Sequence, residues 1–302
     1  MSWLVTGASG MLARDVLAAL ASLGEDAVAL DRTALDLTEA PAVREAVAAL
    51  RPHRVVNCAA WTAVDDAETR EPEALAVNGT AVRHLAATCA ESGATLVHLS
   101  TDYVFAGDAT APYPESAAPA PRSAYGRTKL VGERAVRGLL PERGYVLRTA
   151  WLYGAGGRNF VRTMLDLERA RPYVDVVTDQ VGQPTWTADL AGQLIALARS
   201  GAPGGIYHGT ASGQASWYEL AREVFRLAGA DPDRVRPTTS DAYPRPAARP
   251  AYSVLGHARW AQAGLAPLRD WREALAEAVP AMRAAPPAGA AQSSATAPIA
   301  SA

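Results

Sequence analysis

Short apolar segments alternate with longer amphipathic ones through the first half of the chain, and this alternation constrains the fold more than any other feature. The apolar segments have strand length, and the intervening segments repeat their apolar residues at helical spacing. Such alternation is typical of a parallel sheet covered by helices on both faces. The expected strands are 2–6, 27–30, 54–60, 95–99 and 145–148, and the expected helices are 11–23, 41–50, 72–92 and 123–139.

The first strand ends in a glycine turn that leads directly into a helix. Gly7 permits a tight turn, and Gly10 allows the backbone to approach a pyrophosphate held at the helix N-terminus. Ala13 occupies the third glycine position of the dinucleotide-binding fingerprint and is small enough for close helix–strand packing. We therefore predict an α/β fold with a Rossmann-type doubly wound parallel sheet. The turn residues expected to contact a cofactor are Gly7, Ser9, Gly10, Met11 and Leu12.

The second strand ends in Asp31-Arg32, about 20 residues beyond the glycines. Asp31 would favour NAD by bonding a ribose 2′-hydroxyl, whereas Arg32 would favour NADP by receiving a 2′-phosphate. Both cofactors remain open at this point. Asp36 and Leu37 follow where an adenine edge could rest, although Asp36 is equally suited to capping a helix.

The third strand ends in small residues that would let a cofactor lie against the backbone. Ala59, Ala60 and Thr62 are the candidates, because ligands of open α/β sheets bind at the carboxyl ends of the strands. Asn78 lies among apolar residues of the following helix. It is either a buried structural residue or a contact on the cofactor side.

The chain contains a single lysine, Lys129, and a tyrosine precedes it by four residues. Residues at i and i+4 share one face of a helix, so the phenol of Tyr125 and the ammonium are expected to point into the same space. A neighbouring cation should lower the pKa of the tyrosine from about 10 and suit it to acid–base chemistry. Thr101, at the end of the fourth strand, is positioned to hold a carbonyl oxygen. The alternative is an ordinary surface Tyr–Lys pair.

Composition excludes several classes of function. The 302 residues are 49% hydrophobic and 20% charged, with a net charge of −2, which gives no electrostatic basis for binding nucleic acid or a membrane surface. No segment is long enough to span a bilayer, and the N-terminus lacks a signal-peptide pattern, so we expect a cytoplasmic protein. Cys58 and Cys89 have the spacing of neither a disulfide framework nor a zinc site.

The second half mixes short strands and helices. We expect residues 1–150 to form the dinucleotide-binding part and 151–283 a smaller, mixed part that partly returns to the first sheet. Helices are expected at 159–169, 189–199 and 271–277, with another around Ala258, and a capping box at Ser216 and Glu219 opens one more helix, to Leu227. Arg249 lies in an Arg/Pro-rich segment that is either a diphosphate contact or a rigid surface loop. Residues 284–302 read as a disordered Ala/Pro/Ser tail.

The combination of motifs resembles the dTDP-4-dehydrorhamnose reductase family of extended short-chain dehydrogenase/reductases. The motifs are Gly7-xx-Gly10, Asn57-Cys-Ala-Ala-Trp-Thr-Ala-Val-Asp-Asp-Ala-Glu68, Ser100-Thr-Asp-Tyr-Val-Phe105, Tyr125-xxx-Lys129, Arg148-Thr-Ala-Trp-Leu-Tyr153, Asn159-Phe160, Gln183-Pro-Thr185 and Arg249-Pro-x-x-Ser253. The resemblance covers nearly the whole chain short of the tail. It implies NADPH-dependent reduction, with NADH possible, of a dTDP-4-keto-6-deoxy-L-hexose, and a monomer or homodimer.

The resemblance also implies roles for individual residues. Tyr125 would be the proton donor, Lys129 would hold the nicotinamide ribose, and Thr101 would bind the keto oxygen. The residues implied to frame the sugar or lie near the diphosphate are Val64, Asp65, Asp102, Tyr103, Trp151 and Arg249. Some members use magnesium bound by glutamates, which have no match in this sequence, so no metal ligand is assigned and dependence on Mg²⁺ stays open.

Three alternatives are weighed against this interpretation. Sugar-nucleotide dehydratases of the same fold carry Thr-Asp-Glu where this chain has Tyr103, so an acid that dehydration needs is missing. Another dTDP-4-keto-sugar reductase, such as a dihydrostreptose synthase, would share the same active-site chemistry. A non-catalytic regulatory subunit of methionine adenosyltransferase also resembles the family but tends to lack the tryptophan found at Trp151.

Overall fold

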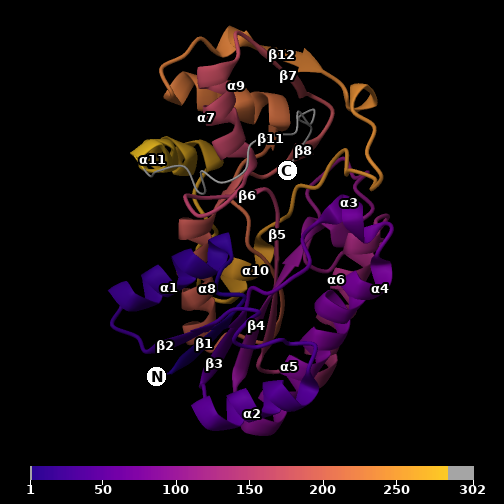
Figure 1. The fold of residues 1–302 in the computed structure, drawn as a ribbon, viewed down its shortest axis with the longest axis vertical. Coiled ribbons are helices and arrows are strands. Elements are labelled where there is room, and N and C mark those ends of the chain that lie inside the picture. Colours follow the sequence, from indigo (N-terminus) through magenta and orange to yellow (C-terminus); the bar gives the residue numbers. More distant parts are fainter. Residues whose placement is uncertain (1, 285–302) are drawn as a thin grey trace.

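A six-stranded, wholly parallel sheet forms the lower half of the molecule (Figure 1). The computed structural model describes residues 2–284. The strand order is β10-β5-β4-β3-β1-β2, so the chain changes direction between β1 and β3. In doubly wound sheets that change of direction is where ligands bind. The strands are β1 (Trp3–Thr6), β2 (Ala27–Leu30), β3 (Arg54–Asn57), β4 (Thr95–Thr101), β5 (Gly144–Thr149) and β10 (Gly205–His208).

Helices cover both faces of this sheet, as the alternating sequence predicts. Trp3 and Val5 of β1 pack into one apolar cluster with α1 and α8, whereas Leu4 packs into the opposite cluster with α2 and α5. The period-two alternation of a strand explains why neighbouring residues enter different clusters. The helices of this half are α1 (Met11–Ser22), α2 (Ala40–Leu50), α3 (Val64–Ala67), α4 (Glu71–Leu75), α5 (Ala81–Ser92), α6 (Ala124–Leu139), α8 (Thr187–Ser200) and α10 (Ala258–Gln262).

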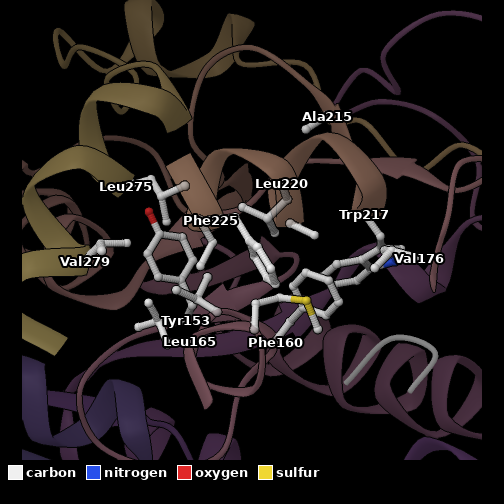
Figure 2. Close-up of a cluster of buried hydrophobic side chains, with 14 of the residues drawn as sticks. Tyr153, Phe160, Leu165, Val176, Ala215, Trp217, Leu220, Phe225, Leu275 and Val279 are labelled. Atoms are coloured by element: carbon white, nitrogen blue, oxygen red, sulfur yellow. The ribbon is translucent and has the colours of Figure 1, made fainter. Parts of the chain in front are cut away.

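A smaller part with its own apolar core lies above the sheet (Figure 1). Figure 2 shows part of that core, in which Phe160, Trp217 and Phe225 belong to the same cluster as Leu275 and Val279 of the last helix. Its elements are β6 (Leu152–Tyr153), α7 (Phe160–Ala170), β7 (Val174–Val177), β8 (Val181–Gly182), β9 (Thr185–Trp186), β11 (Ala215–Ser216), α9 (Trp217–Leu227), β12 (Val235–Thr238) and α11 (Trp271–Ala284). The predicted capping box of Ser216 and Glu219 begins α9.

Two predicted elements differ from the structure. The single helix expected over 72–92 is instead α4, a π-helical segment Ala76–Thr80 and α5. The strand expected to run to residue 60 ends at Asn57, and the next three residues form an irregular segment at the sheet edge. Both departures contribute residues to the cavity described below, and π-bulges frequently occur at functional sites.

The second half returns to the first sheet through α8 and β10, which pack with the dinucleotide-binding elements. We propose that residues 1–150 form the dinucleotide-binding part and residues 151–283 the mainly substrate-binding part, some of which returns to the first sheet. The predicted disordered tail begins at Ala284, which is instead the last residue of α11, and the rest of the predicted tail lies outside the described residues. Within residues 2–284, no helix has the length and apolarity that crossing a membrane requires.

Candidate active site

A cavity of about 650 Å³ opens where the carboxyl ends of the parallel strands meet the upper part of the molecule. Its walls combine the glycine turn, the ends of β3, β4 and β5, and residues of α6, α7 and α9. Of the predicted site residues, those that line it are Gly7, Ser9, Gly10, Met11, Leu12, Arg32, Asp36, Leu37, Ala59, Ala60, Thr62, Val64, Thr101, Asp102, Tyr103, Tyr125, Lys129 and Trp151. The structure therefore brings residues from widely separated motifs into one space.

The glycine turn fits closely against the segment that follows β3. Gly7 has φ +69°, and a Cβ added to it would lie 2.6 Å from the Ala59 backbone nitrogen. The Gly7 carbonyl accepts a hydrogen bond of 2.9 Å from the Gly10 N–H. Gly10 precedes α1 and has no side chain to cap it, so the first N–H groups of the helix are available to an anion.

Replacing Gly7 with Ala should weaken NADPH binding by about tenfold or more, because the added Cβ pushes the turn away from Ala59. Gly24→Ala is the matched control, since Gly24 has nearly the same φ of +67° but nothing within 4 Å of its added Cβ. That control should lose about 1 kcal/mol of stability and no cofactor affinity. Fluorescence titration of both variants measures the difference, and equal losses of affinity would contradict the role assigned to the close approach.

The two residues that end β2 face different ways. Asp31 is not among the residues that line the cavity, and its Oδ1 accepts hydrogen bonds from the Thr33 N–H, the Thr33 hydroxyl and the Ala34 N–H. These bonds hold the pKa of Asp31 below its ordinary value. These bonds shape the turn that follows β2, and a contact of Asp31 with a cofactor stays a prediction. Arg32 lines the cavity, is 84% exposed and lies 3.9 Å from Asp36.

Asn78 is also excluded from the cavity wall, although the sequence suggested a cofactor contact. Its Oδ1 accepts from the Trp61 N–H at 2.9 Å, and its Nδ2 donates to the Trp61 carbonyl at 3.1 Å and to Thr128 Oγ1 at 3.2 Å. The side chain is fully buried in the π-helical segment. Asn78 therefore fixes the loop that carries Ala60 and Thr62. This agrees with the first of its two predicted roles, that of a buried structural residue.

Thr101, Tyr125 and Lys129 all line the cavity. Thr101 ends β4, and Ser123 caps α6 by accepting the Gly126 N–H at 3.1 Å, which places Tyr125 and Lys129 one turn apart. The Thr101 side chain is close enough to the Tyr125 phenol to influence its pKa. The Lys129 ammonium donates to the Leu99 carbonyl at 2.6 Å and is 2% exposed.

The expectation of a lowered tyrosine pKa is wrong for this structure. Burial is the largest influence and raises the pKa of Tyr125 to about 12, and the neighbouring Asp102 carboxylate adds to the effect. Lys129 points its ammonium at the Leu99 carbonyl, and burial lowers its own pKa to about 8. Desolvation of the buried phenolate raises the pKa of the phenol by more than a cation on the same helix face can lower it.

Asp102 is a buried carboxyl beside these groups. Its Oδ1 accepts the Thr101 hydroxyl at 3.0 Å, and its Oδ2 has no hydrogen-bond partner in the described part of the chain. Burial raises the pKa of Asp102 to about 6, and the neighbouring Ser253 and Thr101 side chains oppose that rise. Both Asp102 and Ser253 line the cavity, although Asp102 is only 2% exposed.

Trp151 forms another part of the cavity wall. It adopts φ +48°, a left-handed conformation that is unusual for a tryptophan. Its ring stacks on Trp217 with centroids 3.5 Å apart, and Gly182 leaves the room, since a Cβ there would lie 2.5 Å from the Trp151 ring. The sequence named Trp151 but missed Trp217, whose only signal was its place at the start of a capped helix. Further lining residues missed in the same way are Phe160, Gln180 and Leu220.

Asp65 and Arg249 lie outside the cavity wall and bind each other. Arg249 donates from Nη1 to Asp65 Oδ1 at 3.0 Å and from Nη2 to Oδ2 at 2.9 Å. Arg245 lies 3.7 Å from the same carboxylate. Desolvation raises the pKa of Asp65, but the arginines outweigh it and leave the value lowered. The pair ties α3 to the segment ahead of Pro250 and Ser253, which do line the cavity.

Among residues 2–284, no three His, Cys, Asp or Glu side chains gather as a metal site would require. Cys89 is buried as expected, whereas Cys58 is only partly buried and lines the cavity; both are free thiols.

A Rossmann sheet, a glycine turn at its switch point and a Thr–Tyr–Lys group in the adjoining cavity define an extended short-chain dehydrogenase/reductase. Comparison with known proteins narrows this class. The family model described as "RmlD substrate binding domain" matches residues 1–284. The chain belongs to that family.

Relatives and solved structures in the family match over nearly their full length. A dTDP-4-dehydrorhamnose reductase of Streptomyces griseus is 58% identical over 93% of this chain and 93% of its own. A dTDP-4-keto-6-deoxy-D-glucose reductase of Streptomyces niveus is 55% identical over 93% of this chain and 98% of its own. The crystal structure of dTDP-4-dehydrorhamnose reductase from Bacillus anthracis in complex with NADP superposes with a TM-score of 0.88 at 36% identity, covering 92% of this chain and 98% of the other.

Proposed function

We propose that this protein reduces the 4-keto group of dTDP-4-dehydro-β-L-rhamnose to give dTDP-L-rhamnose, with NADPH as the preferred reductant. The observation that carries the proposal is that Thr101, Tyr125 and Lys129 line one cavity together with the glycine turn and Trp151. The family and the reductases of Streptomyces griseus and Bacillus anthracis support the substrate class.

The residues present suit a dinucleotide. The close approach of Gly7 to Ala59 leaves no room for a side chain, and the start of α1 presents backbone N–H groups to a diphosphate. The residues that would hold the dinucleotide are Gly7, Ser9, Gly10, Met11, Leu12, Arg32, Asp36, Leu37, Ala59, Ala60 and Thr62. When bound, a reduced nicotinamide supplies the hydride.

The protein itself supplies the proton and the orientation. Because burial raises the pKa of Tyr125 to about 12, the phenol keeps its proton at neutral pH and can donate it to the oxygen at C4. Thr101, which lines the same cavity as that phenol, would hold the same oxygen in line. Lys129, one turn further along α6, would contact the ribose and support the negative charge that develops on the phenolate. Val64, Asp102, Tyr103 and Trp151 would frame the sugar.

Arg32 supports NADPH over NADH. It lines the cavity and is largely exposed, whereas Oδ1 of the neighbouring Asp31 accepts a hydrogen bond from the Thr33 N–H in the turn. Arg32→Ala should raise the Kd for NADPH about tenfold, the loss of one charge-assisted contact, and leave the Kd for NADH nearly unchanged. Isothermal titration with both dinucleotides measures this, and an equal effect on both would overturn the assignment of Arg32 to a 2′-phosphate.

A second candidate function is reduction of a different dTDP-4-keto-6-deoxyhexose, because the Streptomyces niveus relative carries such a name at 55% identity. The deciding experiment offers the protein dTDP-4-keto-L-rhamnose, generated in situ, and dTDP-4-keto-6-deoxy-D-glucose, with each product identified by NMR. Oxidation of NADPH with only the L-sugar supports the first function. Turnover of only the D-sugar would replace it with the second.

We further propose a cytoplasmic protein that acts as a monomer or homodimer.

A further inference from the structure

His98 is a fully buried histidine of β4 that none of the assigned roles uses. Its Nδ1 lies 3.1 Å from Asn57 Nδ2, and its Nε2 lies 3.5 Å from Lys129 Nζ. The imidazole therefore sits between the end of β3 and the lysine of the proposed active site. Burial and the nearby lysine lower the pKa of His98 well below its ordinary value, so the ring is neutral.

The orientation of the Asn57 amide is fixed by its other partners. Its Oδ1 accepts the Ala59 N–H at 3.1 Å and the Thr6 hydroxyl at 2.9 Å. A backbone N–H can only donate, so the oxygen must be on that side and the Nδ2 group must face His98. An amide NH₂ can only donate as well, and this makes His98 Nδ1 an acceptor.

A neutral imidazole with an acceptor at Nδ1 carries its proton on Nε2. His98 therefore directs an N–H toward Lys129, although an ammonium has no lone pair to accept it. An uncharged amine can accept that N–H and still donate to the Leu99 carbonyl. The contact accordingly favours the uncharged form of the lysine.

The other titratable neighbours of Lys129 do not cancel this effect. Glu133, one turn further along α6, favours the ammonium, but both its oxygens already bind Arg148. Burial raises the pKa of the Cys58 thiol to about 12, which keeps it uncharged. Tyr125 likewise keeps its proton at neutral pH, because burial raises the pKa of its phenol.

We propose that His98 is a positioning residue for Lys129. Asn57 fixes His98 as the Nε2–H tautomer, and this tautomer favours the uncharged amine of Lys129 over the ammonium. The same contacts connect Lys129 to the glycine turn, because Asn57 also accepts the Ala59 N–H, and Ala59 packs against Gly7. The inference deepens the proposed function, since it concerns a residue assigned there.

The single lysine makes a direct test possible. Protein labelled with [ε-¹³C]lysine gives one lysine signal, whose shift against pH reports the Lys129 midpoint without substrate. The wild-type midpoint should lie near 8, as burial lowers the pKa of Lys129 to about 8. His98→Gln should raise the midpoint by about one pH unit, because the glutamine amide can turn its oxygen toward the ammonium.

His208→Gln is the matched control, since His208 is equally buried in the same sheet but bonds the Gly256 carbonyl at 2.9 Å. It should leave the midpoint unchanged. An unchanged midpoint in His98→Gln would overturn the proposal.

If that variant fails to fold, ¹⁵N shifts of the wild-type histidines decide instead. A protonated Nε2 on His98 supports the proposal, and a protonated Nδ1 overturns it. Neither measurement depends on turnover, so a protein inactive on every keto-sugar would still give a clear result.

Discussion

Tyr125→Phe should lower kcat about 10²–10⁴-fold while leaving the Kd for NADPH nearly unchanged. The substitution removes only the phenolic hydroxyl, and with it the proton that must reach the oxygen at C4 as hydride arrives at the carbon. The ring stays in place, with its edge toward Tyr103 at a centroid distance of 5.7 Å. Steady-state kinetics and fluorescence titration of NADPH separate the two effects.

Tyr145→Phe is the matched control for this loss. Tyr145 is a buried tyrosine of β5 whose hydroxyl donates to the Ala202 carbonyl at 2.6 Å, away from the cavity. Its removal should reduce stability by about 1 kcal/mol and leave kcat intact. If Tyr125→Phe retained kcat within tenfold of wild type, Tyr125 would not be the proton donor.

Glu133→Gln should reduce the free energy of unfolding by about 3–5 kcal/mol, the largest effect on stability expected from a single substitution here. Glu133 and Arg148 form a bidentate ion pair with distances of 2.8 and 2.7 Å, and their side chains are 2% and 0% exposed. Glutamine keeps the shape and can still bond Ser100, but it leaves the guanidinium charge buried without compensation. Urea-induced unfolding followed by circular dichroism measures the loss.

Glu223→Gln serves as the comparison, because Glu223 pairs with Arg226 at the surface of α9, where the arginine is 58% exposed. Solvent screens that pair, and its loss should change the unfolding midpoint only slightly. Similar shifts for the two glutamine variants would mean that the buried pair is not essential to the β5–α6 packing.

The sequence predicts well what depends on local pattern. The glycine turn, the alternating faces of β1 and the capped helix that sets Tyr125 beside Lys129 all follow from spacings of a few residues. The convergence of Thr101 with that helix also follows, since carboxyl ends of parallel strands meet at one edge of a sheet.

What the sequence could not predict depends on contacts between distant segments or on burial. Asp65 binds Arg249, which is 184 residues away in the sequence. The π-helical segment that buries Asn78 has no distinct periodicity in the sequence from which it could be predicted. The pKa of Tyr125 was misjudged for a related reason: spacing shows a neighbouring cation, whereas only the fold shows how fully the phenol is buried.

The most direct test of the central claim follows the hydride itself. NADPH carrying deuterium at C4 of the nicotinamide, prepared separately with each stereochemistry, is incubated with the protein and dTDP-4-keto-L-rhamnose, and the sugar product is examined by NMR. The predicted result is dTDP-L-rhamnose with deuterium at C4 from one of the two labelled cofactors only. Cofactor that binds yet leaves the keto-sugar unreduced and unlabelled would contradict the proposed function.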